Sequence, residues 1–330
     1  MITETELWIW FLFGGHLSPQ RAKPLLERWT AEGRTLTEAL ATLPSHADAL
    51  GITPEEEAVL SSPPAALEAS PLALRWNEPL YPAGLRSLPL RQRPALLFYA
   101  GASNLLLRPL VYLAPGELPP AVHELLEATI SQILGESLLV GAIEDSPQAD
   151  LLLGELYDSE GEAWVLTRQG LSTSPTITAH GRLVDDSRLL VVTPLPPAAS
   201  GSPAIDATLH QVALAMASHI IFTDPAAVPL AQAAGSRSGL LLTSQPVGPH
   251  PLPAAVRPCS DASEALQILV SPPLGTDGPA AARAAQELGP GDIAEPKSPA
   301  PSLTPLEILR KLEEAGTVPE SLRRRLLGGQ

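Results

Sequence analysis

From about residue 108 onward, short runs that are apolar throughout alternate with longer stretches of helical spacing, and this alternation constrains the fold most. The apolar runs are Leu110–Ala114, Ser137–Ile143, Trp164–Thr167, Leu189–Thr193, His219–Thr223 and Leu240–Thr243, and the helical stretches are Leu118–Leu134, Pro147–Tyr157, Ala204–Ser218 and Pro225–Ala234. Strands without polar alternation are buried on both faces, as in parallel sheets. Right-handed crossovers then predict an α/β fold with a doubly wound, Rossmann-like parallel sheet that would bind ligands at the carboxyl ends of its strands.

Composition shifts divide the 330 residues into four predicted parts. These are a helical domain (1–70), the Rossmann-like domain (71–250), a Pro/Gly/Ala-rich extension and linker (251–302) and a helical tail (303–330). In the tail, Arg323-Arg324-Arg325 is interpreted either as a phosphate contact or as a solvated helix end that the macrodipole favours.

The first 70 residues carry the start and stop signals of short helices. Ser18 is a plausible N-cap with Pro19 at the first helical position, and Thr53 precedes Pro54 and three glutamates. Short helices separated by glycine-containing turns can form a helix-hairpin-helix type of DNA contact. Nearly every such bundle is also an adequate structural cap, so both interpretations stay open.

Charge limits the partners that the chain can bind. The sequence carries 21 Lys+Arg against 36 Asp+Glu, a formal charge of −15, and it has three lysines. A broad grip on duplex DNA, which needs several phosphate neutralisations, is therefore not expected. The single cysteine, Cys259, excludes a disulfide framework within the chain and a Cys-rich zinc site, and a buried structural thiol is its favoured role over a nucleophile.

The most apolar early stretch, Leu7–Phe13, is too short to cross a bilayer about 30 Å thick. Glu4 and Glu6 precede it, so it lacks the basic start of a signal peptide. We expect a buried first helix, no membrane association and a cytoplasmic protein.

The motifs that usually carry chemistry in a Rossmann-like domain are missing. The first strand is followed by Ala114-Pro115-Gly116-Glu117, which is neither a G-x-G-x-x-G turn nor a P-loop, so no nucleotide cofactor is predicted. The histidines show no metal-ligand spacing. His210, on the face of the predicted helix Ala204–Ser218, is the histidine to test for a functional role, with a structural role favoured. Glu144-Asp145 follows a strand and is interpreted either as a metal or acid–base pair or as a solvated turn. We predict no catalytic centre and no metal site.

Several strings in one collinear order resemble the DNA-processing protein A (DprA/Smf) family. The clearest are Trp76-Asn77-Glu78-Pro79-Leu80-Tyr81-Pro82-Ala83-Gly84-Leu85 and Arg93-Pro94-Ala95-Leu96-Leu97-Phe98-Tyr99-Ala100-Gly101, in which Pro94 is expected to start an edge strand; weaker ones are Gly170–Pro175, Thr193–Pro197 and Ala213–Asp224. The resemblance spans about residues 5–245. It implies a Rossmann-like domain behind a helical domain, and a non-catalytic accessory in DNA uptake and recombination that binds single strands.

The functional residues of that family are mostly replaced. Its Gly-Ser-Arg is Ala114-Pro115-Gly116 here, its phosphate loop survives as Val140-Gly141-Ala142, and its Arg-Asn-Arg is Leu209-His210-Gln211. Residues 81–250 hold 8 Arg and no Lys against 15 Asp+Glu. The resemblance therefore implies a shared fold more firmly than shared DNA binding.

Three functions follow from these observations. The first is single-stranded DNA binding, with a recombinase as a partner and a homodimer allowed by the resemblance. Its contacts would be Arg86, Arg91 and Arg93, a residual loop at Gly141 and Ala142, and Gly170, Ser172, Thr173, His210 and Arg237. The second is a degenerate paralogue that serves as a protein-interaction or dimerisation module. The third is a nucleotide-type ligand-binding Rossmann protein, an enzyme in which the carboxylates of Glu144 and Asp145 would act on a ribosyl-type substrate. In a DNA-binding protein the arginines should lie in one stripe on the surface. In a paralogue that has lost DNA binding they should be scattered over the surface.

Overall fold

The structure, a computed structural model, describes residues 2–65, 67, 71–202, 204–228, 238–244 and 252–270, all within one compact unit that spans Met1–Pro273. Arg237, the predicted helical residues 229–234, the linker after residue 270 and the tail with Arg323–Arg325 lie outside the described residues.

The first 60 residues form the helices α1 (Glu4–Phe13), α2 (Pro19–Ala31), α3 (Leu36–Ala41) and α4 (Pro54–Leu60). Their starts are set locally. Thr53 and Glu56 make the capping box of α4, as its sequence predicted. Ser18 is the N-cap of α2 with Pro19 at its first position, although the Ser18 side chain makes no capping hydrogen bond. The buried first helix is confirmed, because Leu7, Trp8, Phe11 and Leu12 are at most 7% exposed.

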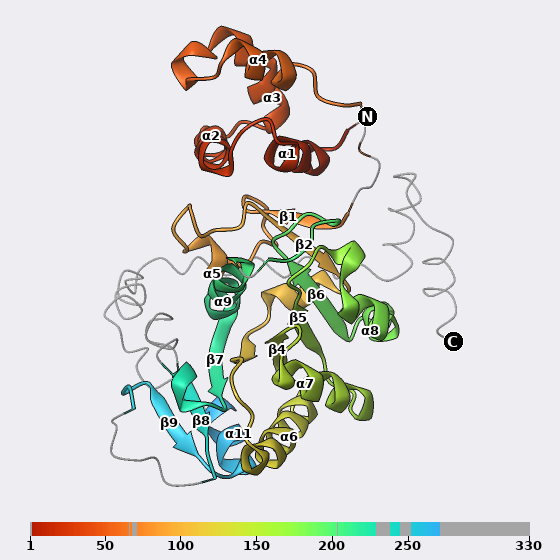
Figure 1. The fold of residues 1–330 in the computed structure, drawn as a ribbon, viewed down its shortest axis with the longest axis vertical. Coiled ribbons are helices and arrows are strands. Elements are labelled where there is room, and N and C mark those ends of the chain that lie inside the picture. The colour runs from red at the N-terminus through yellow and green to blue at the C-terminus, as the bar shows by residue number, and fades with distance from the viewer. Residues whose placement is uncertain are drawn as a thin grey trace, which may run out of the picture. The chain divides into compact units, whose positions relative to one another are not determined.

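A nine-stranded sheet follows (Figure 1). Its strands are β1 (Ala73–Arg75), β2 (Leu96–Ala100), β3 (Leu110–Leu113), β4 (Leu139–Ile143), β5 (Ala163–Leu166), β6 (Leu189–Thr193), β7 (Ala217–Phe222), β8 (Ser238–Leu242) and β9 (Val256–Cys259), in the order β1-β2-β6-β5-β4-β3-β7-β8-β9. Strands β3 to β9 pair in parallel, whereas β1 and β2 are antiparallel. The chain reverses its winding direction between β3 and β7, which is the topological switch point.

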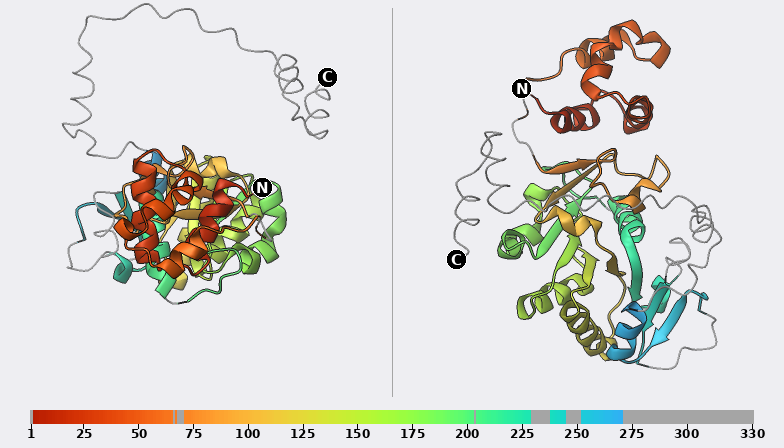
Figure 2. Two further views of the ribbon diagram at one scale, coloured as in Figure 1. Left: turned by 90° about the horizontal axis from the view of Figure 1, so that it is seen from above. Right: turned by 180° about the vertical axis from the view of Figure 1, so that it is seen from behind.

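Helices cover both faces of this sheet. α6 (Pro120–Gly135), α7 (Pro147–Asp158), α8 (Pro175–Asp185) and α11 (Ala262–Val270) lie on one side and α9 (Ala204–Met216) on the other (Figures 1 and 2). Alternate residues of one strand enter different cores: Val111 packs with α6 and α7, and Tyr112 packs with α9. Burial on both faces is therefore the reason why the strands are apolar throughout, and the predicted fold class is confirmed.

The helical domain contacts the sheet through its first helix. The rings of Trp8 and Trp76 meet edge to face at 5.6 Å, and the rings of Phe13 and Phe98 lie 6.0 Å apart. Trp8, Trp76 and Phe98 belong to the same buried core as α9, whereas Phe13 is 42% exposed. No helix within the described ranges is long and apolar enough to span a bilayer.

Three sequence expectations need correction. The strand that follows Pro94 is not at an edge, because β2 lies between β1 and β6. The segment assigned to the extension contains β9 and α11, which extend the sheet domain to Val270; the prolines at 253 and 258 hid this strand. Helix α8 was missed because Gly181 and the polar residues around it obscure its periodicity.

Candidate functional site

Glu144 lies at the carboxyl end of β4 and is 2% exposed. Its carboxylate accepts hydrogen bonds from the Thr167 hydroxyl (2.5 Å), the Ser174 hydroxyl (2.8 Å) and the backbone N–H of Thr176 (3.1 Å). Because Ser174 and Thr176 belong to the first turn of α8, this carboxylate occupies the helix N-terminus, where a bound phosphate often sits in α/β folds. Neither sequence interpretation of Glu144 describes it, since it is buried and fully hydrogen-bonded.

Asp145 differs from its neighbour, because its side chain is 58% exposed and its backbone is left-handed with φ 59°. It therefore fits the solvated-turn interpretation. The two carboxylates do not form a metal site with a third ligand, because no group of three His, Cys, Asp or Glu suited to a metal occurs among the described residues.

Arg168 is the cation at this carboxyl edge, and sequence reasoning missed it. Its Nε donates to Asp206 Oδ1 at 2.7 Å, its Nη1 donates to the Glu144 carbonyl oxygen at 2.7 Å, and its Nη1 lies 3.8 Å from Asp145 Oδ2. The residue follows β5 after Thr167, so the end of a predicted parallel strand was the available signal.

His210 lies one helical turn beyond Asp206 on α9. Its Nδ1 and the Tyr112 hydroxyl are 3.1 Å apart. Burial lowers the pKa of His210. The negative charge of Asp206 raises this pKa in part, and the positive charge of Arg168 lowers it further. The imidazole is therefore a neutral hydrogen-bonding group at neutral pH.

The turn with Gly170, Ser172 and Thr173 lies beside the same edge, but its N–H groups have internal partners. Gly170 N–H donates to Ala199 O at 2.8 Å, and Ser172 N–H donates to Pro197 O at 3.0 Å. A Cβ at Gly170 would lie 2.1 Å from Pro197 O, so close backbone approach requires glycine here. The N–H groups of Gly170 and Ser172, which were predicted to contact DNA, thus hold the loop at residues 197–199.

Gly141 and Ala142 were predicted to lie in a residual loop, and this placement is wrong. Both lie within β4, where Gly141 is opposite Tyr112 and Trp164 and Ala142 is opposite Val165. Buried on both faces, they are part of the sheet interior.

Side-chain hydrogen bonds cross the switch point of the sheet. Gln148 Nε2 donates to Gly116 O at 3.0 Å and to Thr223 Oγ1 at 2.9 Å, and so links the ends of β3 and β7. Thr223 Oγ1 in turn donates to Glu117 O at 3.0 Å. Ligands of open α/β sheets bind at this point, and Gln148 occupies hydrogen-bonding groups there.

Arg86, Arg91 and Arg93 lie in the segment before β2. Arg86 donates to the carbonyl oxygens of Glu78 and Pro79, and Arg93 donates to Leu88 O at 3.0 Å. The Arg91 side chain makes no hydrogen bond or ion pair to the part of the chain that the structure describes.

Arg91 instead borders a hollow of about 800 Å³ between α2 and residues 89–92. The hollow is lined by Pro19, Gln20, Lys23, Pro24, Pro89, Leu90, Arg91 and Gln92. Lys23 Nζ donates to the carbonyl oxygens of Arg91 at 3.3 Å and of Arg93 at 2.9 Å. Burial, and secondarily Arg93, lowers the pKa of Lys23. The lining thus holds two cations and no carboxylate.

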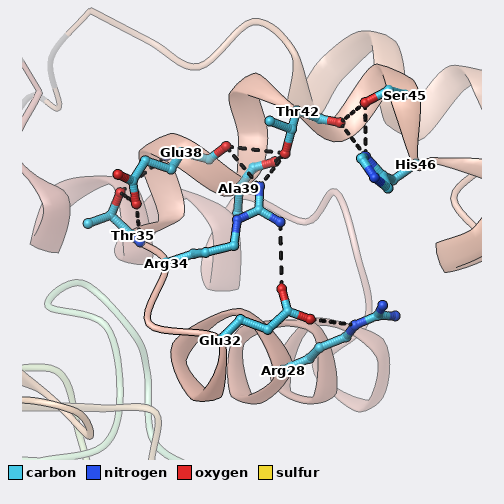
Figure 3. Close-up of polar contacts among 9 residues, drawn as sticks. All are labelled: Arg28, Glu32, Arg34, Thr35, Glu38, Ala39, Thr42, Ser45 and His46. Atoms are coloured by element: carbon cyan, nitrogen blue, oxygen red, sulfur yellow. Dashed lines mark hydrogen bonds and ion pairs between the residues drawn. The ribbon is translucent and has the colours of Figure 1, made fainter.

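The other described arginines are largely engaged. Arg28 and Arg34 both pair with Glu32, and Arg34 also donates to the Thr42 hydroxyl, as Figure 3 shows. Carboxylate partners also hold Arg21, Arg75, Arg108, Arg168 and Arg182, and backbone carbonyls hold Arg188. Most of the described arginines thus have partners within the chain, whereas Arg257 on β9 is exposed and its side chain makes no hydrogen bond or ion pair to the described residues.

Fold and site together define a doubly wound, Rossmann-like protein with a helical domain before the sheet and an internally hydrogen-bonded carboxyl edge. No protein-family model matches the chain, and no curated protein matches its sequence. Among solved structures it is similar to DNA processing protein A (DprA) from Streptococcus pneumoniae, with a TM-score of 0.59 and 17% identity over 81% of this chain and 98% of that one. DNA processing protein A from Helicobacter pylori, whose structure concerns single-stranded DNA binding, matches with a TM-score of 0.47 and 12% identity over 57% of this chain and 92% of that one. The chain thus has the fold of DNA processing protein A, and the predicted resemblance is confirmed for the fold.

Proposed function

We propose that this chain is a DprA-like protein that binds single-stranded DNA without catalysing a reaction on it, as a cytoplasmic accessory in DNA uptake and recombination. The fold of the Streptococcus pneumoniae protein, matched over nearly its whole length, and the collinear strings around Trp76 and Tyr81 support the proposal. A recombinase partner and a homodimer follow from the same resemblance and belong to the proposal.

The hollow beside α2 is the observation that carries DNA binding. Arg91 and Lys23 are its two cations, and Pro19, Pro24 and Leu90 give it apolar walls. We assign a phosphate contact to Arg91 and base contacts to the walls, while the carbonyl oxygens of Arg91 and Arg93 hold Lys23 in place. One phosphate contact gives weak binding with a slope of about −0.7 in a plot of log affinity against log salt.

A second function, a protein-interaction module without DNA binding, is favoured by a different observation. Arg86 and Arg93, two of the predicted contacts, are held by backbone carbonyls, and Arg168 is held by carboxylates. A chain with a formal charge of −15 and its cations engaged in this way suits a protein partner better than a polyanion.

Fluorescence anisotropy with a labelled oligo-dT strand at two salt concentrations separates the two functions. For DNA binding we expect Arg91→Ala to weaken binding several-fold and to reduce the salt slope by about 0.7. The matched control is Arg182→Ala, which removes one exposed arginine from the i,i+4 pair with Asp186 and should change nothing. Absence of wild-type binding at tens of micromolar protein in low salt would rule out the first function in favour of the second.

A further inference from the structure

Arg168 at the carboxyl edge faces more negative than positive charge. Asp206 approaches its Nε at 2.7 Å and Asp145 lies 3.8 Å from its Nη1. One guanidinium is thus opposed by two carboxylates, and the group as a whole carries a formal charge of −1. The side chains of Arg168, Asp145 and Asp206 are 28%, 58% and 40% exposed, so solvent and ligands reach all three.

The position of Arg168 does not depend on these carboxylates alone. Its Nη1 also donates to the Glu144 carbonyl oxygen at 2.7 Å, and Glu144 is held in turn by Thr167 and Ser174. Partly exposed ion pairs contribute little to stability because water screens them. The stronger consequence of the two aspartates is therefore electrostatic: they decide what charge this edge presents to a ligand.

A guanidinium binds phosphate as readily as carboxylate, since both offer paired oxygens to its N–H groups. We propose that Asp145 and Asp206 are specificity-determining residues that mask Arg168, and that Arg168 binds a phosphate group of a single strand once both aspartates are neutral. The mask excludes polyanions from the carboxyl edge of the sheet. The inference goes beyond the hollow beside α2, which different residues line, and it holds whether or not that hollow binds DNA.

The test uses the full chain with both aspartates replaced, Asp145→Asn with Asp206→Asn, which retains the shape of the side chains. The matched control, Glu124→Gln with Glu160→Gln, removes two charges from exposed positions that pair with no arginine among the described residues. We expect the first variant to bind oligo-dT about ten-fold more tightly than the control at low salt, which is the gain from one charge-assisted contact. Its salt slope should exceed that of the control by about 0.7.

Adding Arg168→Gln to the unmasked variant should abolish the gain, whereas adding Arg91→Ala should leave it unchanged. Equal affinity of the unmasked and control variants would overturn the inference, and so would a gain that survives Arg168→Gln. Urea unfolding of each variant shows that it is folded before binding is compared. If the wild type does not bind oligo-dT but the unmasked variant does, the hollow fails as a DNA site and the inference about Arg168 stands. If the wild type binds and the unmasked variant gains no affinity over its control, the hollow stands and the inference about Arg168 fails.

Discussion

The Tyr81 hydroxyl donates a hydrogen bond of 2.7 Å to the carbonyl oxygen of Pro94, and both residues are buried. This contact joins the two strings that most resemble the DprA/Smf family. It closes the segment that leads from Trp76 into β2, so the Tyr-Pro and Arg-Pro pairs serve one structural purpose. Burial raises the pKa of Tyr81, which keeps the hydroxyl protonated as a donor.

Replacing Tyr81 with Phe should therefore destabilise the chain. We expect Tyr81→Phe to lower the free energy of unfolding by about 1–2 kcal/mol, because the carbonyl oxygen of Pro94 loses its donor in a buried place. Urea unfolding measures this loss. Tyr157→Phe is the control, since Tyr157 is 50% exposed and water can replace its contact with His180. Equal effects of the two substitutions would contradict the structural role of the Tyr81 hydroxyl.

Glu144 should contribute to stability through its three buried donors. We expect Glu144→Ala to lower the free energy of unfolding by about 2–3 kcal/mol, because Thr167, Ser174 and Thr176 then lack their shared acceptor. Glu144→Gln keeps one acceptor oxygen and should lose less. The exposed Glu160→Ala should stay within about 0.5 kcal/mol of the wild type. If Glu144→Ala were as harmless as Glu160→Ala, the carboxylate would not be holding α8.

Two glycines should respond oppositely to alanine. Gly170→Ala places a Cβ 2.1 Å from Pro197 O, and we expect a loss of about 1–3 kcal/mol from the forced backbone shift. Gly154 lies inside α7 with no atom within 4 Å of its Cβ position, so Gly154→Ala should stabilise by about 0.5–1 kcal/mol through helix propensity. Thermal or urea unfolding checks both signs. A neutral Gly170→Ala would show that the turn at 170–173 is not held as described.

Stability should also fall as the solution becomes acidic. Burial lowers the pKa of His219, whose Nε2 is buried without a partner among the described residues. A lowered native pKa means that the unfolded chain binds the proton first. The contribution of the neutral His219 side chain to the free energy of unfolding is therefore fully present above 6.5, the pKa of histidine in the unfolded chain. This contribution is lost as the pH falls through the lower pKa of His219 in the folded chain.

The free energy of unfolding, measured by urea from pH 7.5 to pH 5.5, checks this dependence. His219→Gln should make the profile flatter, because glutamine binds no proton in this pH range. His180 and His210 have pKa values lowered by burial as well, so some slope should persist in His219→Gln. A profile of unchanged slope would show that His219 does not carry the effect.

Local features of the sequence were sufficient for much of the fold. Strand β6 matches its predicted range Leu189–Thr193, and the start of α4 follows from Thr53 and the glutamates after it. Both depend on neighbours in the chain: a strand buried on both faces is apolar residue by residue, and a capping box spans three residues. The same reasoning placed Cys259 in the interior, where it is 2% exposed.

The candidate site was less predictable because its contacts join distant segments. Arg168 and Asp206 are 38 residues apart in the sequence, and Gln148 and Thr223 are 75 apart. Gly141 lies in β4, within the predicted strand run Ser137–Ile143, and its missing Cβ leaves room for Leu110; only its assignment to a residual loop failed.

The sequence by itself determined the class of fold, through strands apolar enough to be buried on both faces, and the scarcity of positive charge. Only the tertiary structure decided what that charge does. The packing of the sheet places Asp145 and Asp206 beside Arg168 and lets the Gln148 side chain bond across the switch point. It also places Arg91 and Lys23 together in the lining of the hollow beside α2. The physical reason is that secondary structure follows from residues a few positions apart, whereas the field at a binding surface is a sum over side chains that only the packed sheet brings together.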